Sequence, residues 1–76
     1  MNAIEENVIT FTRREEQILI LLARYNTHEE ICSILNLKVG TLDQHIANIR
    51  RKTNKIGIKL VKYAIEQGFG REEVSA

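Results

Sequence analysis

The sequence predicts an all-α fold, a compact four-helix domain with a central helix-turn-helix, and three observations support this prediction. Apolar residues recur at three- and four-residue spacing in four short segments between Phe11 and Phe69. Residues that commonly start or stop a helix lie at the ends of these segments. The chain has 76 residues, which is enough for one small domain but not for an enzyme pocket with its scaffold.

The first helix is expected over residues 13–24. Thr12 and Glu15 form a Thr-x-x-Glu capping box, in which the hydroxyl accepts from the backbone three residues later and the carboxylate accepts from the backbone of the cap residue. Asn26 is expected to end the helix. The apolar stripe that this helix should bury consists of Ile18, Leu19, Leu22 and Tyr25.

The second helix is expected over residues 28–35, because the same capping box recurs at Thr27 and Glu30. One side of it carries Ile31, Cys32 and Leu35. Asn36 then breaks the helix, since Asn adopts the left-handed conformation of a tight turn at low cost. A short helix, a tight turn and a longer helix are typical of a helix-turn-helix.

The third helix is expected over residues 39–52 and has two different faces. Inward-compatible positions hold Leu42, His45, Ile46 and Ile49. The opposite face carries a polar and basic row formed by Gly40, Gln44, Ala47 or Asn48, and Arg51. Such a row on one side of a helix can reach base edges in the DNA major groove. The basic cluster at its far end would meet phosphates.

The fourth helix is expected over residues 58–67, with Gly68 in the C-cap position. Its apolar side consists of Leu60, Val61, Ala64 and Ile65. Residues 1–11 and 71–76 lack sustained periodicity, so they are interpreted as a flexible N-terminal arm and a C-terminal tail around a domain at 12–70.

The charges are segregated along the chain although the net charge is only +1. Residues 1–37 carry a net −3, residues 38–62 a net +6, and residues 63–76 a net −2. This pattern is expected if one face meets a polyanion. A solvated helix face explains it equally well from composition alone. Glu5, Glu6, Glu15 and Glu16 are interpreted as solvated charges.

Other kinds of chemistry find little support in the sequence. Cys32 is the single cysteine, so a disulfide within the chain is excluded; a buried free thiol is favoured over a reactive one. His28 has no Cys or His nearby at metal-ligand spacing, so no metal is expected. No Ser-His-Asp arrangement, phosphate loop or carboxylate pair with a pocket is present, so no enzyme, cofactor or small-molecule ligand is expected.

The apolar runs also bear on location in the cell. The longest run, residues 18–23, is far shorter than the roughly 18 residues of a membrane span. The sequence shows no signal peptide. We therefore expect a cytoplasmic protein with no membrane association.

The residues from Thr12 to Phe69 also match a known family pattern. The matching positions are Thr12, Arg14, Glu15, Leu21, Leu22, Ala23, Glu30, Ile31, Cys32, Leu35, Leu37, Thr41, Leu42, His45, Asn48, Ile49, Lys52, Leu60 to Ile65, Gly68 and Phe69. This combination resembles the DNA-binding domain of LuxR/FixJ/GerE-type, or NarL-like, bacterial transcription regulators. The resemblance implies a four-helix domain that inserts its third helix into the major groove and often dimerises through its fourth. The dimer-interface candidates are Leu60, Val61, Ala64 and Ile65. Members usually carry a receiver or ligand-binding domain in front, so this chain is expected to be a free-standing regulator of the short GerE kind or an excised domain.

The sequence departs from the family pattern at positions that commonly touch DNA. Asp43 and Glu29 stand where a Lys is common, and Lys38 replaces the usual Ser or Thr cap. The common Arg near Ile58 is missing. An Asp on the DNA face repels phosphates, or accepts from cytosine N4 if it reaches a base. These departures concern the contacts with DNA rather than the fold.

The candidate DNA contacts fall into two groups. Base-reading candidates are Asp43, Gln44, Ala47 and Asn48, of which Gln44 can pair bidentately with adenine. Backbone candidates are Thr27, His28, Lys38, Thr41, His45, Arg50, Arg51, Lys52 and Lys55. A partly buried structural role is an alternative for His45, and simple solvation is one for the Arg-Arg-Lys run.

Three functional hypotheses follow. The first is a bacterial transcription regulator that binds specific duplex DNA as a homodimer. The second is a protein-interaction module of the anti-activator type, which kept the fold, lost DNA affinity and binds a related regulator or RNA polymerase. The third is a sigma-factor-like promoter-binding domain, suggested by residues 27–31 but disfavoured by the run from Thr41 to Ile49. Ile20 and Ile34 are apolar at positions that the resembling family usually leaves polar, and Ile56 and Ile58 are further apolar residues. Together they indicate either a partner surface or ordinary scattered exposure.

Overall fold

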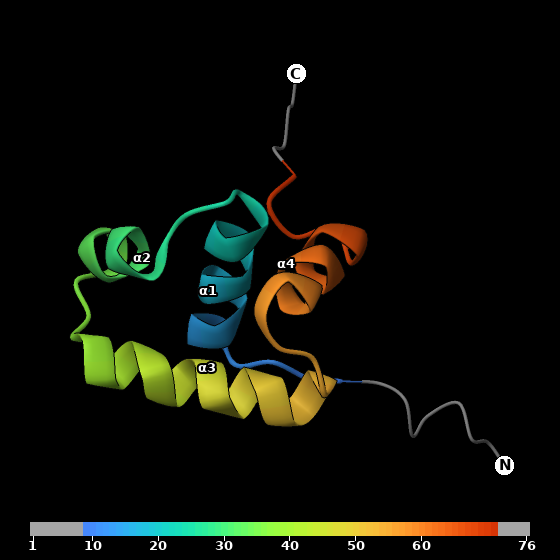
Figure 1. Cartoon of the computed structure of the whole chain (residues 1–76), viewed down its shortest axis with the longest axis horizontal. Helices are drawn as coiled ribbons and strands as arrows, with labels where there is room; N and C mark the ends of the chain where they lie inside the picture. Colours follow the sequence, from blue (N-terminus) through green and yellow to red (C-terminus); the bar gives the residue numbers. More distant parts are fainter. Residues whose placement is uncertain (1–8, 72–76) are drawn as a thin grey trace, which may run out of the picture.

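The computed structural model describes residues 9–71, which form four helices and no strand. They are α1 (Arg13–Ala23), α2 (His28–Leu35), α3 (Val39–Thr53) and α4 (Gly57–Glu66). Helix α1 is central and packs against the other three, while α3 runs along one edge of the domain (Figure 1). The all-α prediction and the predicted helix order are confirmed, with boundaries that differ by one residue at several helix ends.

The starts of α1 and α2 follow the predicted capping boxes. The backbone N–H groups of Glu15 and Glu30 each donate to the preceding Thr hydroxyl at 3.1 Å. Their carboxylates accept from the N–H groups of Thr12 and Thr27 at 2.9 and 2.8 Å. Helix α3 begins differently, because Lys38 at its N-cap makes no side-chain capping bond.

Helix α1 ends earlier than predicted, and Tyr25 adopts the left-handed conformation with φ 67°. The N–H of Tyr25 donates to the carbonyl of Leu22 at 2.9 Å, and the N–H of Asn26 donates to that of Leu21 at 3.1 Å. This pair of bonds is a Schellman motif. The prediction that Tyr25 belongs to the buried stripe is therefore wrong: the chain reverses at this residue, whose side chain is 74% exposed.

Helix α4 ends in the same kind of motif. Gln67 is the C-cap residue, so the predicted C-cap Gly68 lies one position later, with φ 92°. The N–H of Phe69 donates to the carbonyl of Ala64 at 3.0 Å. Because this turn folds the chain back, Phe69 packs against the core.

The packed part of the chain begins before the predicted boundary. Phe11, which was assigned to the arm, packs against the core and makes an edge-to-face contact with Phe69 at 6.1 Å between ring centroids. Residues 1–8 and 72–76 lie outside the described residues, so the predicted arm and tail, and the charges of Glu5 and Glu6, are untested.

The core is filled from all four helices. Its fully buried large side chains are Ile18, Leu19, Ile31, Leu42 and Ile49. Leu60 and Ala64 of α4 are 3% and 0% exposed and belong to the same cluster. The prediction that these two residues form a dimer interface is therefore corrected. The apolar spacing of α4 serves packing within the domain, and of the four predicted residues only Val61 and Ile65 are not buried.

The other apolar side chains singled out in the sequence range from half-buried to exposed. Cys32 is half-buried rather than buried. Ile20 is half-buried, whereas Ile34, Ile56 and Ile58 are 56%, 61% and 69% exposed. The last three thus leave apolar surface for contact with another molecule.

Candidate nucleic-acid interface

Helix α3 offers one long side that no other described element covers. In Figure 1, helices α1, α2 and α4 all lie on the same side of α3. The turn that leads into α3 uses Asn36 in the left-handed conformation with φ 58°, as predicted. The 15 residues of α3 span about 22 Å at 1.5 Å per residue. A major groove about 12 Å wide admits such a helix.

Gln44, Asn48 and Arg51 of the predicted polar row lie on the open side of α3, and Thr41, predicted as a DNA-backbone contact, lies with them. Thr41, Gln44 and Arg51 are exposed, and Asn48 is half-buried. The Arg51 guanidinium donates a hydrogen bond to Asn48 Oδ1, which holds the two side chains together along the helix. Gln44 has no side-chain hydrogen bond to any residue among 9–71, so both ends of its amide are available. We call Thr41, Gln44, Asn48 and Arg51 the outer row.

The inward face of α3 explains why the outer row points away from the domain. Leu42, Ile46 and Ile49 are all buried against the core. Because side chains three and four residues apart share a face of a helix, burying these three fixes the rotation of α3. His45 and Ala47 are half-buried on the flanks.

Lys52 turns inward, unlike Arg51. Its Nζ lies 2.7 Å from Glu15 Oε1 and 3.0 Å from the Thr10 carbonyl oxygen. It also lies 5.7 Å from the centroid of the Phe11 ring. We call Thr10, Phe11, Glu15 and Lys52 the Glu15 cluster. A predicted phosphate contact is thus already engaged within the domain.

Glu15 itself is 3% exposed, so its interpretation as a solvated charge is wrong, whereas Glu16 is exposed as expected. Burial raises the pKa of the Glu15 carboxyl, but hydrogen bonds from Lys52 and Thr12 outweigh burial and hold that pKa below its ordinary value of 4.5. Glu15 is therefore a charged group that connects the start of α1 to the end of α3.

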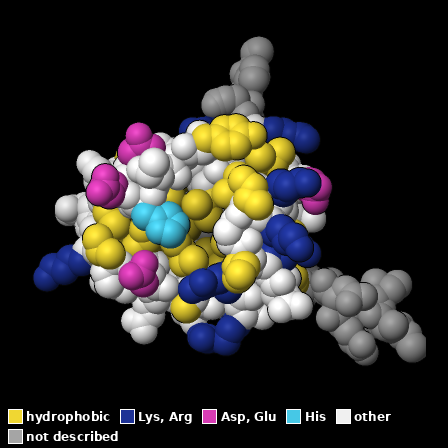
Figure 2. Space-filling model, viewed as in Figure 1, with side chains coloured by type: hydrophobic (Ala, Val, Ile, Leu, Met, Phe, Trp, Pro, Cys, Tyr) yellow, Lys and Arg dark blue, Asp and Glu magenta, His cyan; other side chains and the backbone are white. Residues whose placement is uncertain are grey.

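Asp43, His28 and Arg50 lie away from the outer row and line a groove of about 370 Å³ beside α3. The rest of its lining is mostly apolar and consists of Leu22, Asn26, Ile46, Gly57, Leu60 and Val61. Figure 2 shows hydrophobic side chains recessed on this face with one histidine beside them. Asp43 therefore belongs to the flank of α3 rather than to the row that contains Gln44.

The remaining backbone candidates surround α3. Lys38 is exposed at the start of α3, and Lys55 is half-buried in the loop after it. The hydroxyl of Thr27 is occupied by the capping bond from Glu30. Lys38 and Lys55 thus place basic groups just before and just after α3 in the chain.

Two further lysines were missed by the sequence analysis. Lys59 and Lys62 of α4 line one shallow hollow together with Lys55, Tyr63 and Glu66. We call Lys55, Lys59 and Lys62 the lysine ridge. The signal that could have revealed it is the net +6 of residues 38–62, which is larger than α3 alone provides.

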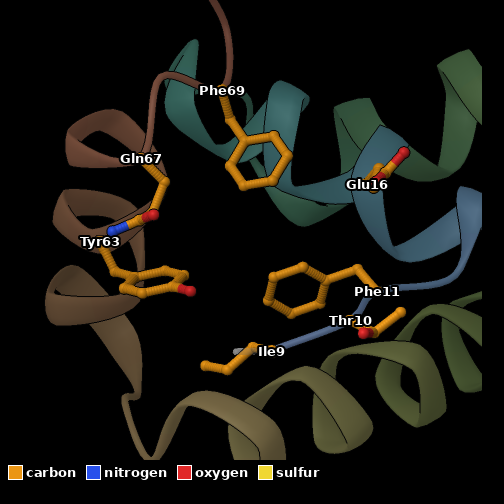
Figure 3. Close-up of a pocket in the computed structure, with 7 residues that line it drawn as sticks. All are labelled: Ile9, Thr10, Phe11, Glu16, Tyr63, Gln67 and Phe69. Atoms are coloured by element: carbon orange, nitrogen blue, oxygen red, sulfur yellow. The ribbon is translucent and has the colours of Figure 1, made fainter. Parts of the chain in front are cut away.

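A second cleft lies apart from the outer row. It has a volume of about 620 Å³ and is lined by Ile9, Thr10, Phe11, Glu16, Tyr63, Gln67 and Phe69. Figure 3 shows the rings of Phe11, Tyr63 and Phe69 around it. Across residues 9–71 there is no group of His, Cys, Asp and Glu side chains that could hold a metal ion. None of the described helices is long and apolar enough to cross a membrane.

Comparison with known proteins assigns this arrangement to a family. Residues 9–58 match the family described as "Bacterial regulatory proteins, luxR family". The Transcriptional activator protein ExpR of Pectobacterium parmentieri is 38% identical over 59 residues, which are 78% of this chain and 23% of that protein. The Uncharacterized response regulatory protein YgeK of Escherichia coli (strain K12) is 40% identical over 58 residues, which are 75% of this chain and 40% of that protein. The chain thus spans less than half of either relative. No solved structure gives a significant match.

Proposed function

The chain belongs to the LuxR family of bacterial regulatory proteins, and from this premise we propose that it is a cytoplasmic transcription regulator that binds specific duplex DNA through α3 in the major groove, as a dimer. The family is one of regulators rather than enzymes. The related activator ExpR supports a role in transcription.

The outer row of α3 is the observation that carries this proposal. A DNA-reading helix needs polar side chains that face away from the core and lie within reach of base edges. Gln44 meets this need because it is exposed and its amide has no partner within residues 9–71. Arg51 extends the row toward the sugar-phosphate backbone of the DNA, and Thr41 and Lys38 lie at the other end of the row.

A dimer is supported by the remaining accessible surface of α4. Ile58, Val61 and Ile65 follow one another at three- and four-residue spacing, which places them on one side of the helix. Ile58 and Ile65 are 69% and 39% exposed. A second copy of the chain would cover this stripe, and half-sites about one helical turn apart would then be read by the two α3 helices.

The direct test is a selection from a randomised duplex pool, followed by anisotropy titrations at about 50 and 200 mM salt. We expect binding that weakens steeply with salt and an enriched, repeated or palindromic motif. Absence of binding at the lower salt concentration would remove the proposed function.

A matched pair of variants tests the outer row. Gln44→Ala is expected to weaken binding to the selected site by roughly 1–3 kcal/mol and to relax one base position, because a bidentate base contact is lost. Gln67→Ala makes the same side-chain change at the exposed C-cap position that follows α4 and should leave binding unchanged. Equal losses on every DNA sequence for Gln44→Ala would show that Gln44 does not read a base.

A protein-interaction module is the second candidate function, and the groove beside α3 favours it. The groove is lined mainly by apolar side chains, with Asp43, His28 and Arg50 at its polar positions. In this case the chain would bind a related regulator or RNA polymerase. Absence of DNA binding in the titration above, together with capture of such a partner, would support it.

A further inference from the structure

The lysine ridge continues from the end of α3 along α4. Lys55 lies in the connecting loop. Lys59 and Lys62 follow in α4, three residues apart, a spacing that keeps these two side chains on one side of the helix. All three line the same shallow hollow, whose volume is about 160 Å³. The ridge is thus one surface rather than three separate charges.

Among the described residues, no carboxylate is bonded to the lysines of this surface. Within residues 9–71, the ammonium groups of the ridge form no ion pair and no hydrogen bond, although Glu66 lines the same hollow. Lys52 differs, since it is paired with Glu15 at 2.7 Å. Lys59 and Lys62 are both exposed. Like charges three or four residues apart on a helix weaken it by a few tenths of a kcal/mol.

The position of Lys59 adds to this cost. It lies in the first turn of α4, which has no acidic residue. A cation in the first turn is unfavourable, because the N-terminal end of a helix already carries partial positive charge. The ridge therefore weakens α4 in the free protein, and a bound polyanion would offset the loss.

The location of the ridge indicates which polyanion. A recognition helix contacts base edges mainly through its N-terminal residues, and α3 is about 22 Å long. Its C-terminal end, with Arg50 and Arg51 exposed, would then leave the groove beside the sugar-phosphate backbone. The ridge begins two residues after Thr53, the last residue of α3.

On these grounds we infer that Lys59 and Lys62, together with Lys55, bind phosphates of the duplex outside the base pairs that α3 reads. This inference rests on the proposed function. The charge spacing is compatible with it: Lys59 and Lys62 are separated by a rise of about 4.5 Å along α4, and each DNA strand carries one charge per about 3.4 Å. An acidic protein surface is the competing partner.

Binding to two duplexes of different length distinguishes the DNA contacts of the ridge from those of the outer row. The short duplex carries one selected half-site alone, and the long duplex carries the same half-site with about one helical turn added on each side. The test protein is Lys59→Gln/Lys62→Gln. The matched control is Arg24→Gln/Arg71→Gln, which removes two charges from the end of α1 and from the segment after α4, on the far side of the domain from α3 (Figure 1).

On the long duplex, the log–log salt slope of the test protein should be flatter than that of the wild type by about two units, since each phosphate contact contributes about 0.9. Between 50 and 200 mM salt, the wild type should therefore lose about 12-fold more affinity than the test protein. On the short duplex the two proteins should show the same slope. The control should match the wild type on both, and circular dichroism should report the same helix content for all three.

Other results would overturn the inference in distinguishable ways. Equal slopes on the long duplex would show that the ridge does not touch DNA. If the salt slope of the test protein were flatter by the same amount on both duplexes, these lysines would lie inside the site that α3 reads. Unchanged duplex binding with weakened binding to poly-L-glutamate would assign the ridge to an acidic protein. If the wild type bound neither duplex, the proposed function itself would fail.

Discussion

Arg51 and Lys52 are neighbours in one basic run, yet they belong to two different regions of the molecule. Arg51 is exposed and donates to Asn48 in the outer row. Lys52 points into the Glu15 cluster and is 35% exposed. Adjacent residues of a helix are rotated by about 100°, so one turns to solvent and the other to the domain. A charge run on a helix is therefore not a single surface.

The two regions also divide their physical roles. The outer row contributes little to packing, because its side chains meet solvent or one another. The Glu15 cluster connects Thr10 and Phe11, the start of α1 and the end of α3 through contacts 37 and 42 residues apart in sequence. It fixes where the last turns of α3 lie. The cluster should thus govern stability, and the outer row should govern DNA binding.

The largest effect expected from this division is on stability. Glu15→Ala removes the acceptor of the Lys52 bond and half of the α1 capping box, so it should lower the free energy of unfolding by about 2–4 kcal/mol. Glu16→Ala, at the exposed neighbouring position, should change it by less than about 0.5 kcal/mol. Urea unfolding followed by circular dichroism measures both. Similar losses in the two variants would mean that the cluster adds nothing beyond a surface charge.

A smaller effect on stability is expected when Lys52 and Arg51 are replaced one at a time. Lys52→Met leaves the buried Glu15 carboxylate without its charged donor and should lower the free energy of unfolding by about 1–3 kcal/mol. Arg51→Met should change it by less than about 0.5 kcal/mol but flatten the salt slope of DNA binding by about one unit. Unfolding curves and anisotropy titrations of both variants supply the comparison. The division fails if Lys52→Met flattens the slope and leaves stability intact.

The sequence predicted the local features of this fold well. Capping boxes at Thr12 and Thr27 involve residues three apart, so they could be recognised directly and were confirmed. The buried face of α3 also followed from helical spacing. Gln44, Asn48 and Arg51 of the outer row were predicted by the same argument, because the side opposite a buried stripe must face outward.

Most of the errors depend on contacts between distant parts of the chain. Periodicity cannot show that Glu15 meets Lys52, since their side chains come together only when α1 packs on α3. It likewise cannot tell whether an apolar residue of α4 faces the domain or a partner, which is why Leu60 and Ala64 were misassigned. Tyr25 was misplaced because a non-glycine residue took the left-handed position of the turn, where Asn26 had been expected to end the helix.

The smallest effect expected depends on pH and tests the electrostatic part of the Glu15 cluster alone. Burial raises the pKa of Glu15, but the bonds from Lys52 and Thr12 prevail and hold it below 4.5 in the folded protein. The folded state therefore binds this proton less readily than the unfolded state. The stabilisation is complete at pH values above 4.5 and is lost as the pH falls through the lower folded-state pKa.

Glu15→Gln keeps the size of the side chain and one acceptor oxygen but cannot ionise. It therefore isolates the contribution of the Glu15 charge to stability. The wild type should be more stable than Glu15→Gln at about pH 7, and the difference should shrink by about pH 3. Urea midpoints of the two proteins across this range provide the measurement. A difference that stays constant with pH would mean that shape and hydrogen bonding, rather than charge, hold Lys52 on the inner side of α3.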